Sequence, residues 1–334
     1  MTRVLVIIAV AGFVLATVCF AGAAALGGRE LARQGWFLPW AHDGEWDWDG
    51  DAPPGFRDRR SIDWNGPTKT RDIAWTGDDE VEIALPADVV FTQGPVAKLT
   101  VTGPAGAVDR VMLDDGRIGF EHGPRRHPWS WGRRVGYAPK EGRLQIALTA
   151  PDVRAFTLSG SPNLKIVGFD RDSLDIDLNG GGEVTGQGRV RRLDVEVHGS
   201  GNANLSDLAA EEASVDMMGS GRASITSQAS AEVAIHGSGD VIGAGRAKKV
   251  EIEIFGSGDA DLAGIDAEDA EVKIMGSGKA AVAPTKLADI AIFGSGDVSL
   301  ATKPERLESK VAGSGKIRQR EAETAAVENR TAKR

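Results

Sequence analysis

The sequence predicts an all-β protein whose C-terminal half is a parallel β-helix, or β-solenoid, with rungs of about 19 residues. The tripeptide Gly-Ser-Gly recurs seven times in the 334-residue chain, at intervals of 18 to 20 residues. Its copies begin at Gly199, Gly219, Gly237, Gly256, Gly276, Gly294 and Gly313. Two degenerate copies precede them, Ser159-Gly160-Ser161 and Gly180-Gly181-Gly182. Such regular spacing indicates a repeat architecture in which each copy is one turn of the stack.

The residues before each motif alternate between apolar and polar, which is typical of a strand with one buried face. Apolar residues stand two and four positions before the first glycine, as Ile254 and Ile252 do before Gly256. These segments are short and rich in β-branched residues, which favours strands over helices. One face of every copy is therefore expected to be buried.

A shorter strand is expected after each motif, with inward residues such as Ala260 and Leu262. The stretches that lead to the next copy, 206–212 and 263–270 among them, are expected to be loops. Copies stacked about 4.8 Å apart would join their apolar columns into one core. The motif glycines would supply the unusual backbone angles of the corner between two strands.

An uncharged, mostly apolar run, Val4–Leu26, follows Arg3 and contains Cys19, the only cysteine of the chain. The run is long enough to cross a bilayer core of about 30 Å as a helix. Small residues near its end also offer the cleavage sites of a secretory signal. Residues 1–26 are thus expected to form an N-terminal apolar helix, either a signal peptide or a membrane anchor. Both alternatives export the remainder, to the periplasm, to the inner membrane or to the cell surface.

The rest of the chain divides by composition. Residues 27–70 are expected to be a linker rich in Trp, Asp and Pro. Alternating segments within 71–150 predict a β cap region that covers the first end of the stack. The solenoid is expected over 151–320, and the charged, alanine-rich residues 321–334 are expected to be a disordered tail.

One segment of the cap, Gly123–Arg134, interleaves basic residues with tryptophans, and its candidate contact residues are Arg125, Arg126, Trp129 and Trp131. This composition is able to bind nucleic acid or sugar. A surface loop whose rings fold onto the cap is the simpler interpretation. The formal net charge of −9 and the expected export both argue against nucleic acid as a partner.

A second candidate surface is the column of residues directly before the motif: His198, Met218, His236, Phe255, Met275 and Phe293. Alternation points these side chains away from the core. They either pack against loops and corners or form an exposed apolar interaction surface. His198 and His236 are two copies apart, about 10 Å by the strand spacing, which is too far for one metal ion.

No cofactor and no metal are expected. A nucleotide-binding loop needs a lysine and a Ser/Thr at the start of a helix, whereas this motif lies between strands. Asp240 beside Asp259 offers at most one weak calcium site, because Lys279 follows in the same column. Acidic pairs such as Glu251 and Glu253 recur as ordinary outward residues, so no catalytic residues are expected.

The stretch from Val81 to Ile317 resembles the auto-transporter adhesin head GIN domain family, a bacterial family of unknown molecular function. The resemblance rests on Val90–Pro95, Val108–Val111, Ala150-Pro151 followed by Leu158–Ser161, and the repeated Gly-Ser-Gly-Asp at 237, 256 and 294. It implies a β-helical envelope domain and supplies no catalytic residues. The segment Gly123–Arg134 departs from the family pattern, so its role is not inherited.

These observations predict a non-enzymatic cell-envelope scaffold or adhesin-like binding domain that makes contacts through repetitive solenoid surfaces. Its partner is expected to be an envelope or surface protein or glycan, and the membrane as well if the N-terminal helix is not cleaved. Two alternatives remain open at this point, a membrane-tethered envelope sensor and a carbohydrate-acting β-helix enzyme.

Overall fold

The computed structural model describes residues 62–75, 79–120 and 143–319. The apolar segment 1–26, most of the linker, the segment Gly123–Arg134 and the tail 321–334 lie outside these described residues. In the described ranges, no helix is long and apolar enough to cross a membrane.

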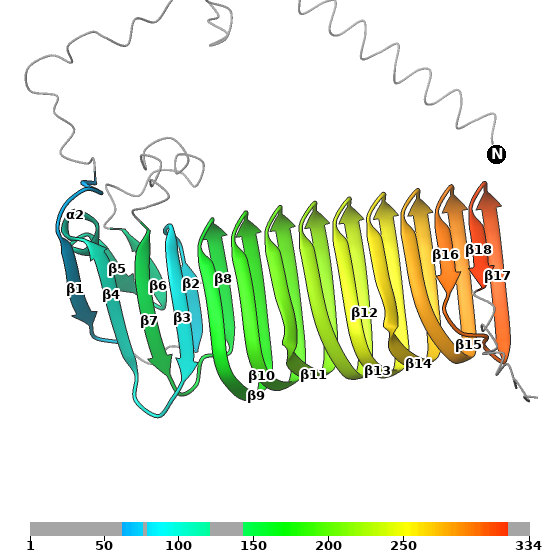
Figure 1. Cartoon of the computed structure of the whole chain (residues 1–334), viewed down its shortest axis with the longest axis horizontal. Coiled ribbons are helices and arrows are strands. Elements are labelled where there is room, and N and C mark those ends of the chain that lie inside the picture. Colours follow the sequence, from blue (N-terminus) through cyan, green and yellow to red (C-terminus); the bar gives the residue numbers. More distant parts are fainter. Residues whose placement is uncertain (1–61, 76–78, 121–142, 320–334) are drawn as a thin grey trace, which may run out of the picture. The chain divides into compact units, whose positions relative to one another are not determined.

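Seven long strands form the body of a parallel β-solenoid (Figure 1). They are β9 (Asn163–Gly180), β10 (Glu183–Gly199), β11 (Asn202–Gly219), β12 (Arg222–Gly237), β13 (Asp240–Gly256), β14 (Asp259–Gly276) and β15 (Lys279–Gly294). Each pairs in parallel with the next, and the motif glycines are partners across the stack, as Gly199 is of Gly219. The solenoid has about 9 turns of about 19 residues, which confirms the predicted fold class.

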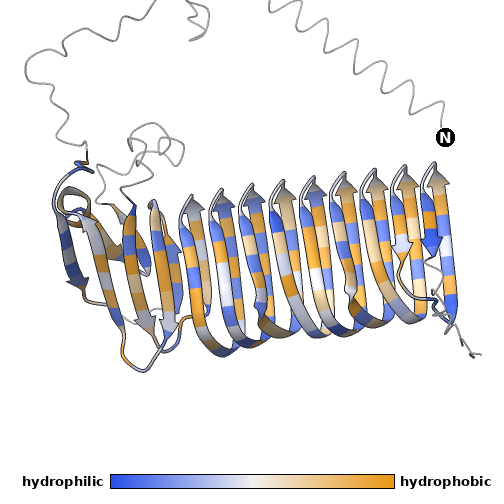
Figure 2. Cartoon of the chain, viewed as in Figure 1, coloured by the Kyte–Doolittle hydropathy of each residue, from blue (hydrophilic) through white to orange (hydrophobic). Residues whose placement is uncertain are grey.

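The inward side chains of successive turns form one continuous apolar core. In β11 the buried residues include Ala203, Leu205, Leu208, Val215 and Met217. Figure 2 shows the cause, because hydrophobic and hydrophilic residues alternate along each strand. The predicted period of two therefore places valine and isoleucine columns in a shared interior.

The prediction that residues 206–212 and 263–270 form loops is wrong. Both stretches belong to the continuous strands β11 and β14, and they bury Leu208 and Ile265 completely. The chain turns there through small register shifts, such as the one between Leu205 and Ala209, and the inward alternation resumes after each shift. Pairing with adjacent turns satisfies the backbone at these bends, so no separate loop is needed.

The first glycine of each of the seven motifs has a φ between 132° and 148°, a conformation that disfavours other residues. Successive corners also lie very close together. A Cβ atom added to Gly256 would lie 2.3 Å from the carbonyl oxygen of Gly237 in the preceding turn. The same oxygen accepts a hydrogen bond of 2.8 Å from the backbone N–H of Ser257, so the corners are tied together through the main chain.

The region expected to be a cap contains further solenoid turns. These are built from β2 (Glu80–Ile83), β3 (Ala87–Gln93), β6 (Arg117–Phe120) and β7 (Leu144–Ala150), and they pair in parallel across the stack with one another and with β8 (Ala155–Gly160), the first strand of the expected solenoid. Spatial order departs from chain order here, because β3 lies between β7 and β9.

Antiparallel elements cover this first end of the stack. They are β1 (Thr68–Ile73), β4 (Lys98–Pro104), the short helix α2 (Ala105–Val108) and β5 (Val111–Asp114). Ile62 and Trp64 also pack against the core, so ordered structure begins inside the expected linker.

The last full turn that the structure describes consists of β16 (Asp297–Leu300) and β17 (Arg306–Gly313), and β18 (Lys316–Gln319) pairs in parallel with β16 to begin the next. Every residue of β17 is exposed, including Leu307 and Val311. Charged residues such as Lys310 and Lys316 decorate this edge, and lysine on an edge strand opposes uncontrolled strand pairing.

Candidate functional site

All six residues of the predicted column lie in register on successive strands, one strand spacing apart. The pairs are His198 with Met218, Met218 with His236, His236 with Phe255, Phe255 with Met275, and Met275 with Phe293. We call this column, His198 to Phe293, the apolar ladder. It runs parallel to the solenoid axis, directly beside the glycine corners.

The apolar ladder faces outward. The methionines and phenylalanines are between 38% and 50% exposed, a high fraction for large apolar side chains. Its members contact one another: the rings of His236 and Phe255 are stacked, with centroids 5.0 Å apart and an interplanar angle of 2°. The Nζ atom of Lys310 lies 5.5 Å from the centroid of the Phe293 ring. His236 and Phe255 thus pack against each other along the axis, and the ladder still presents an open apolar surface.

The orientation of the rings decides which ligands suit this surface. A sugar or a base stacks on a free ring face. The faces of His236 and Phe255 that meet are occupied by each other, and Lys310 lies over Phe293. These ring faces are therefore unavailable to a stacked ligand, and the exposed apolar area of the ladder suits contacts with other apolar side chains or with acyl chains.

An acidic column runs beside the ladder on the same outward face, four residues earlier in each turn. We call it the acidic column: Asp175, Asp194, Ser214, Glu232, Glu251, Glu271, Asp289 and Glu308. Seven of its eight members are carboxylates. The sequence analysis treated these acidic residues as ordinary outward residues and did not recognise that they form one continuous column. The available signal was their constant offset of four residues from the ladder.

Lysines neutralise part of the acidic column in the C-terminal turns. Lys249 forms ion pairs with Glu251 and Glu271, and Lys273 contacts Glu271 at 3.0 Å and Glu253 at 2.9 Å. Hydrogen bonds to Glu253 and Glu271 raise the pKa of Lys273. The hydrogen bond from Lys273 in turn lowers the pKa of Glu271.

The N-terminal turns carry carboxylates without such compensation. Partial burial raises the pKa of Asp175, and the neighbouring carboxylate of Asp194 raises it further by repulsion. Asp177 adds to this effect and Arg192 opposes it. In β9 to β12 the acidic column therefore holds three carboxylates without an ion pair among the described residues, Asp175, Asp194 and Glu232.

Asp175→Asn is expected to raise the melting temperature at pH 7 by about 1–3 °C, because asparagine removes a crowded negative charge. The folded-state pKa is raised above the ordinary value of 3.8. The contribution of protonated Asp175 to stability is therefore complete below pH 3.8 and is lost as pH rises through the folded-state pKa. The gain from asparagine should accordingly shrink at pH 3.

Thermal melts followed by circular dichroism from pH 3 to pH 7 measure this effect. Glu183→Gln is the matched control, because Glu183 is an exposed carboxylate at the start of β10 and lies outside the acidic column. An Asp175→Asn melting temperature at pH 7 no higher than that of the unmodified chain would contradict the repulsion.

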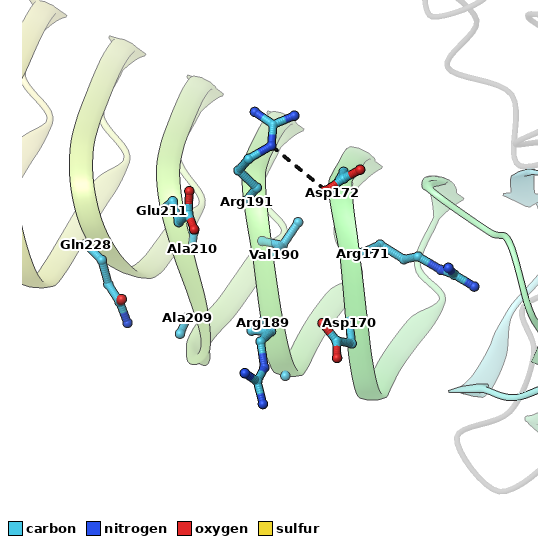
Figure 3. Close-up of a pocket in the computed structure, with 11 residues that line it drawn as sticks. Asp170, Arg171, Asp172, Arg189, Val190, Arg191, Ala209, Ala210, Glu211 and Gln228 are labelled. Carbon is cyan, nitrogen blue, oxygen red and sulfur yellow. Dashed lines mark ion pairs between the residues drawn. The ribbon is translucent and has the colours of Figure 1, made fainter.

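A shallow groove of about 700 Å³ lies over β9 to β12 (Figure 3), and no residue of the apolar ladder lines it. Charged side chains of both signs line it: Asp170, Arg171, Asp172, Arg189, Arg191 and Glu211. Arg191 reaches Asp172 at 4.0 Å, whereas Arg189 extends in the opposite direction. Three positive and three negative groups balance, so the groove does not select one ligand charge. Sequence reasoning missed it, although the repeated 19-residue spacing of Asp and Arg was visible.

The column after the motif is occupied by ion pairs. Asp240 pairs with Arg222 at 3.1 Å, and Asp259 lies 3.9 Å from Lys279. Asp259 also accepts a hydrogen bond from the backbone N–H of Lys279. Within the described residues, no group of three or more His, Cys, Asp or Glu side chains is arranged to hold a metal ion.

The other candidate residues, Arg125, Arg126, Trp129 and Trp131, lie outside the described residues. The structure places only the strands that flank them, β6 ending at Phe120 and β7 beginning at Leu144. Their role as contact residues stays a prediction.

Solved structures of similar fold come from the bacterium Parabacteroides distasonis. A "putative lipid binding protein" is 21% identical, with a TM-score of 0.56, and the match covers 77% of this chain and 98% of that one. A "putative adhesin" is 16% identical, with the same TM-score and the same coverage. At these identities the likeness concerns the fold.

No curated protein matches the chain. The family described as "Putative auto-transporter adhesin, head GIN domain" matches residues 79–247 and 231–304. These ranges together include all the long strands of the solenoid, and the chain therefore belongs to this family.

Proposed function

We propose that the chain is a non-enzymatic binding domain of the cell envelope and that the apolar ladder is its contact surface. The observation that carries this proposal is the stacking of six outward side chains, His198 to Phe293, into one exposed apolar column. Most other outward positions of the same strands are polar. A contiguous exposed apolar surface on a soluble fold marks an interaction site.

The arrangement of carboxylates supports a binding role over hydrolysis of glycosides. Two catalytic carboxyl groups must face one bound sugar across a cleft. Glu251 and Glu253 instead lie on an open sheet and are held by Lys249 and Lys273. Asp261, another outward carboxylate, is also engaged, because it accepts a hydrogen bond from the backbone N–H of Ala263.

The N-terminal apolar run supports an extracytoplasmic location, as a cleaved signal or as a retained anchor. Membership of an adhesin-named family agrees with exposure at the envelope. The mass of the mature N-terminus distinguishes the alternatives, because an anchored chain keeps residues 1–26. Only the anchored form would allow a role as a membrane-tethered sensor.

A triple variant, Met218→Ser, Phe255→Ser and Met275→Ser, is expected to reduce binding to envelope material by about tenfold or more. Each substitution removes exposed apolar area, worth about 25 cal/mol per Å² when buried against a partner. Binding of the full chain to separated envelope proteins, glycans and lipid vesicles is measured for the variant and the unmodified chain.

Ile242→Ser is the matched control, because Ile242 is 46% exposed on another part of the solenoid surface and lies outside the ladder. It should bind as the unmodified chain does. Both proteins should keep their melting temperatures within a few degrees, since surface substitutions change stability little. Undiminished binding by a folded triple variant would refute the ladder as the contact surface.

A further inference from the structure

The surface beside the apolar ladder is strongly acidic in its N-terminal turns. Asp194 belongs to the acidic column, and Glu196 and Asp216 lie between that column and the ladder. The described residues contain no ion pair for Asp194, Asp216 or Glu232, while Glu196 contacts only the ring of His198, at 3.4 Å. An apolar ridge is thus bordered by uncompensated carboxylates.

Asp216 is a further carboxylate of this face whose charge is not neutralised by a neighbour in the described turns. Its Oδ1 atom is buried and has no hydrogen-bond partner. It stands beside Glu196 in the neighbouring turn and two residues before Met218 of the ladder. A buried acceptor without a donor is costly, and no hydrogen bond to this oxygen offsets the negative charge that Asp216 adds to the face.

The dimensions of this surface favour a single segment over a folded domain. Six turns extend about 29 Å along the axis, and the span from acidic column to ladder is about 15 Å wide. The resulting area of roughly 430 Å² is about half of the 800 Å² that each partner buries in a stable complex of folded proteins. One extended polypeptide segment matches this area.

We infer that this face binds a basic polypeptide segment of a partner protein, with apolar side chains on the ladder and lysines or arginines on the carboxylates around Asp194 and Asp216. This inference rests on the proposed function, because it uses the ladder as the apolar half of the site. Charge complementarity selects the partner. A second copy placed face to face would bring two acidic columns together, so it does not fit.

The test uses the full chain and two labelled peptides of about nine residues, a length that extends along six turns. One alternates leucine with lysine and the other alternates leucine with glutamate. Fluorescence anisotropy should show binding of the lysine peptide that is at least about tenfold tighter. Raising the salt concentration from about 0.05 M to about 0.5 M should weaken that binding, since exposed charges are screened.

Two variants separate this inference from the proposed function. The double variant Asp194→Asn, Asp216→Asn should weaken binding of the lysine peptide about fivefold to tenfold, whereas Glu183→Gln should not. The ladder variant Met218→Ser, Phe255→Ser should weaken binding of both peptides. Melting curves verify that each variant is folded.

Different outcomes would overturn this inference alone or the proposed function with it. Equal binding of both peptides, or full affinity in the folded Asp194→Asn, Asp216→Asn variant, would overturn the inference and leave the ladder intact as a contact surface. Binding unaffected by the ladder variant as well would overturn both proposals. Ladder-dependent dimerisation in sedimentation experiments, or ladder-dependent binding to lipid vesicles alone, would replace the basic segment with another partner.

Discussion

Gly256→Ala is expected to destabilise the solenoid by about 3 kcal/mol or more. Gly256 has a φ of 137°, and its added Cβ atom would lie 2.3 Å from the carbonyl oxygen of Gly237. That oxygen belongs to the backbone, so no side chain can move aside to relieve the overlap. Any relief must separate two turns at the corner, which would also weaken the 2.8 Å hydrogen bond from Ser257.

Ser257→Ala is the matched control, one residue away at the same corner. Its side chain is exposed and its contribution to the corner comes from the backbone N–H, so the change should stay within about 0.5 kcal/mol. Urea denaturation followed by circular dichroism measures both variants. Equal stability of Gly256→Ala and Ser257→Ala would show that the corner is not sterically constrained.

Phe91→Ala is expected to cost about 4 kcal/mol, within the range for a fully buried phenylalanine. Phe91 lies on β3, which pairs with both β7 and β9, and its ring packs edge-on against Phe156 with centroids 5.0 Å apart. Both rings are buried. The cavity would open where the first turns join the regular stack, and a stack of turns cannot easily collapse to fill it.

Val90→Ala is the control for this prediction, because Val90 neighbours Phe91, points outward and is 42% exposed. Its cost should be below about 1 kcal/mol. The same urea titration compares Phe91→Ala directly with Val90→Ala, and comparable losses of stability would show that β3 is not integrated into the core. A separate early transition in Phe91→Ala would show that the first turns unfold as a unit, as expected when each turn contacts only its neighbours.

The sequence was sufficient to predict the solenoid because the alternation within each strand and the spacing between repeats agree. Alternation in Val195–Val197 or Ile252–Ile254 identifies a strand with one buried face, and the repeated spacing identifies which strands are neighbours. The alignment of the ladder residues follows from the same spacing. The bends at 206–212 and 263–270 were missed because their pairing partners lie in adjacent turns, not in the local sequence.

The first turns and the character of the site depended on tertiary contacts. No repeated motif predicts that β3 lies between β7 and β9. This arrangement arises from pairing between strands that are far apart in the sequence. Likewise, alternation alone left open whether Met218 and Phe255 were covered or exposed, and only the packing of the described turns leaves them outward.

By itself, the sequence determined the strand period, the turn length and the register of the stack, since these follow from spacing along the chain. The tertiary structure decided where the chain bends, how the first turns interleave and which carboxylates remain uncompensated beside the ladder. The physical reason is that burial and charge neutralisation depend on side chains brought together from different turns, whereas periodicity is a property of each turn alone.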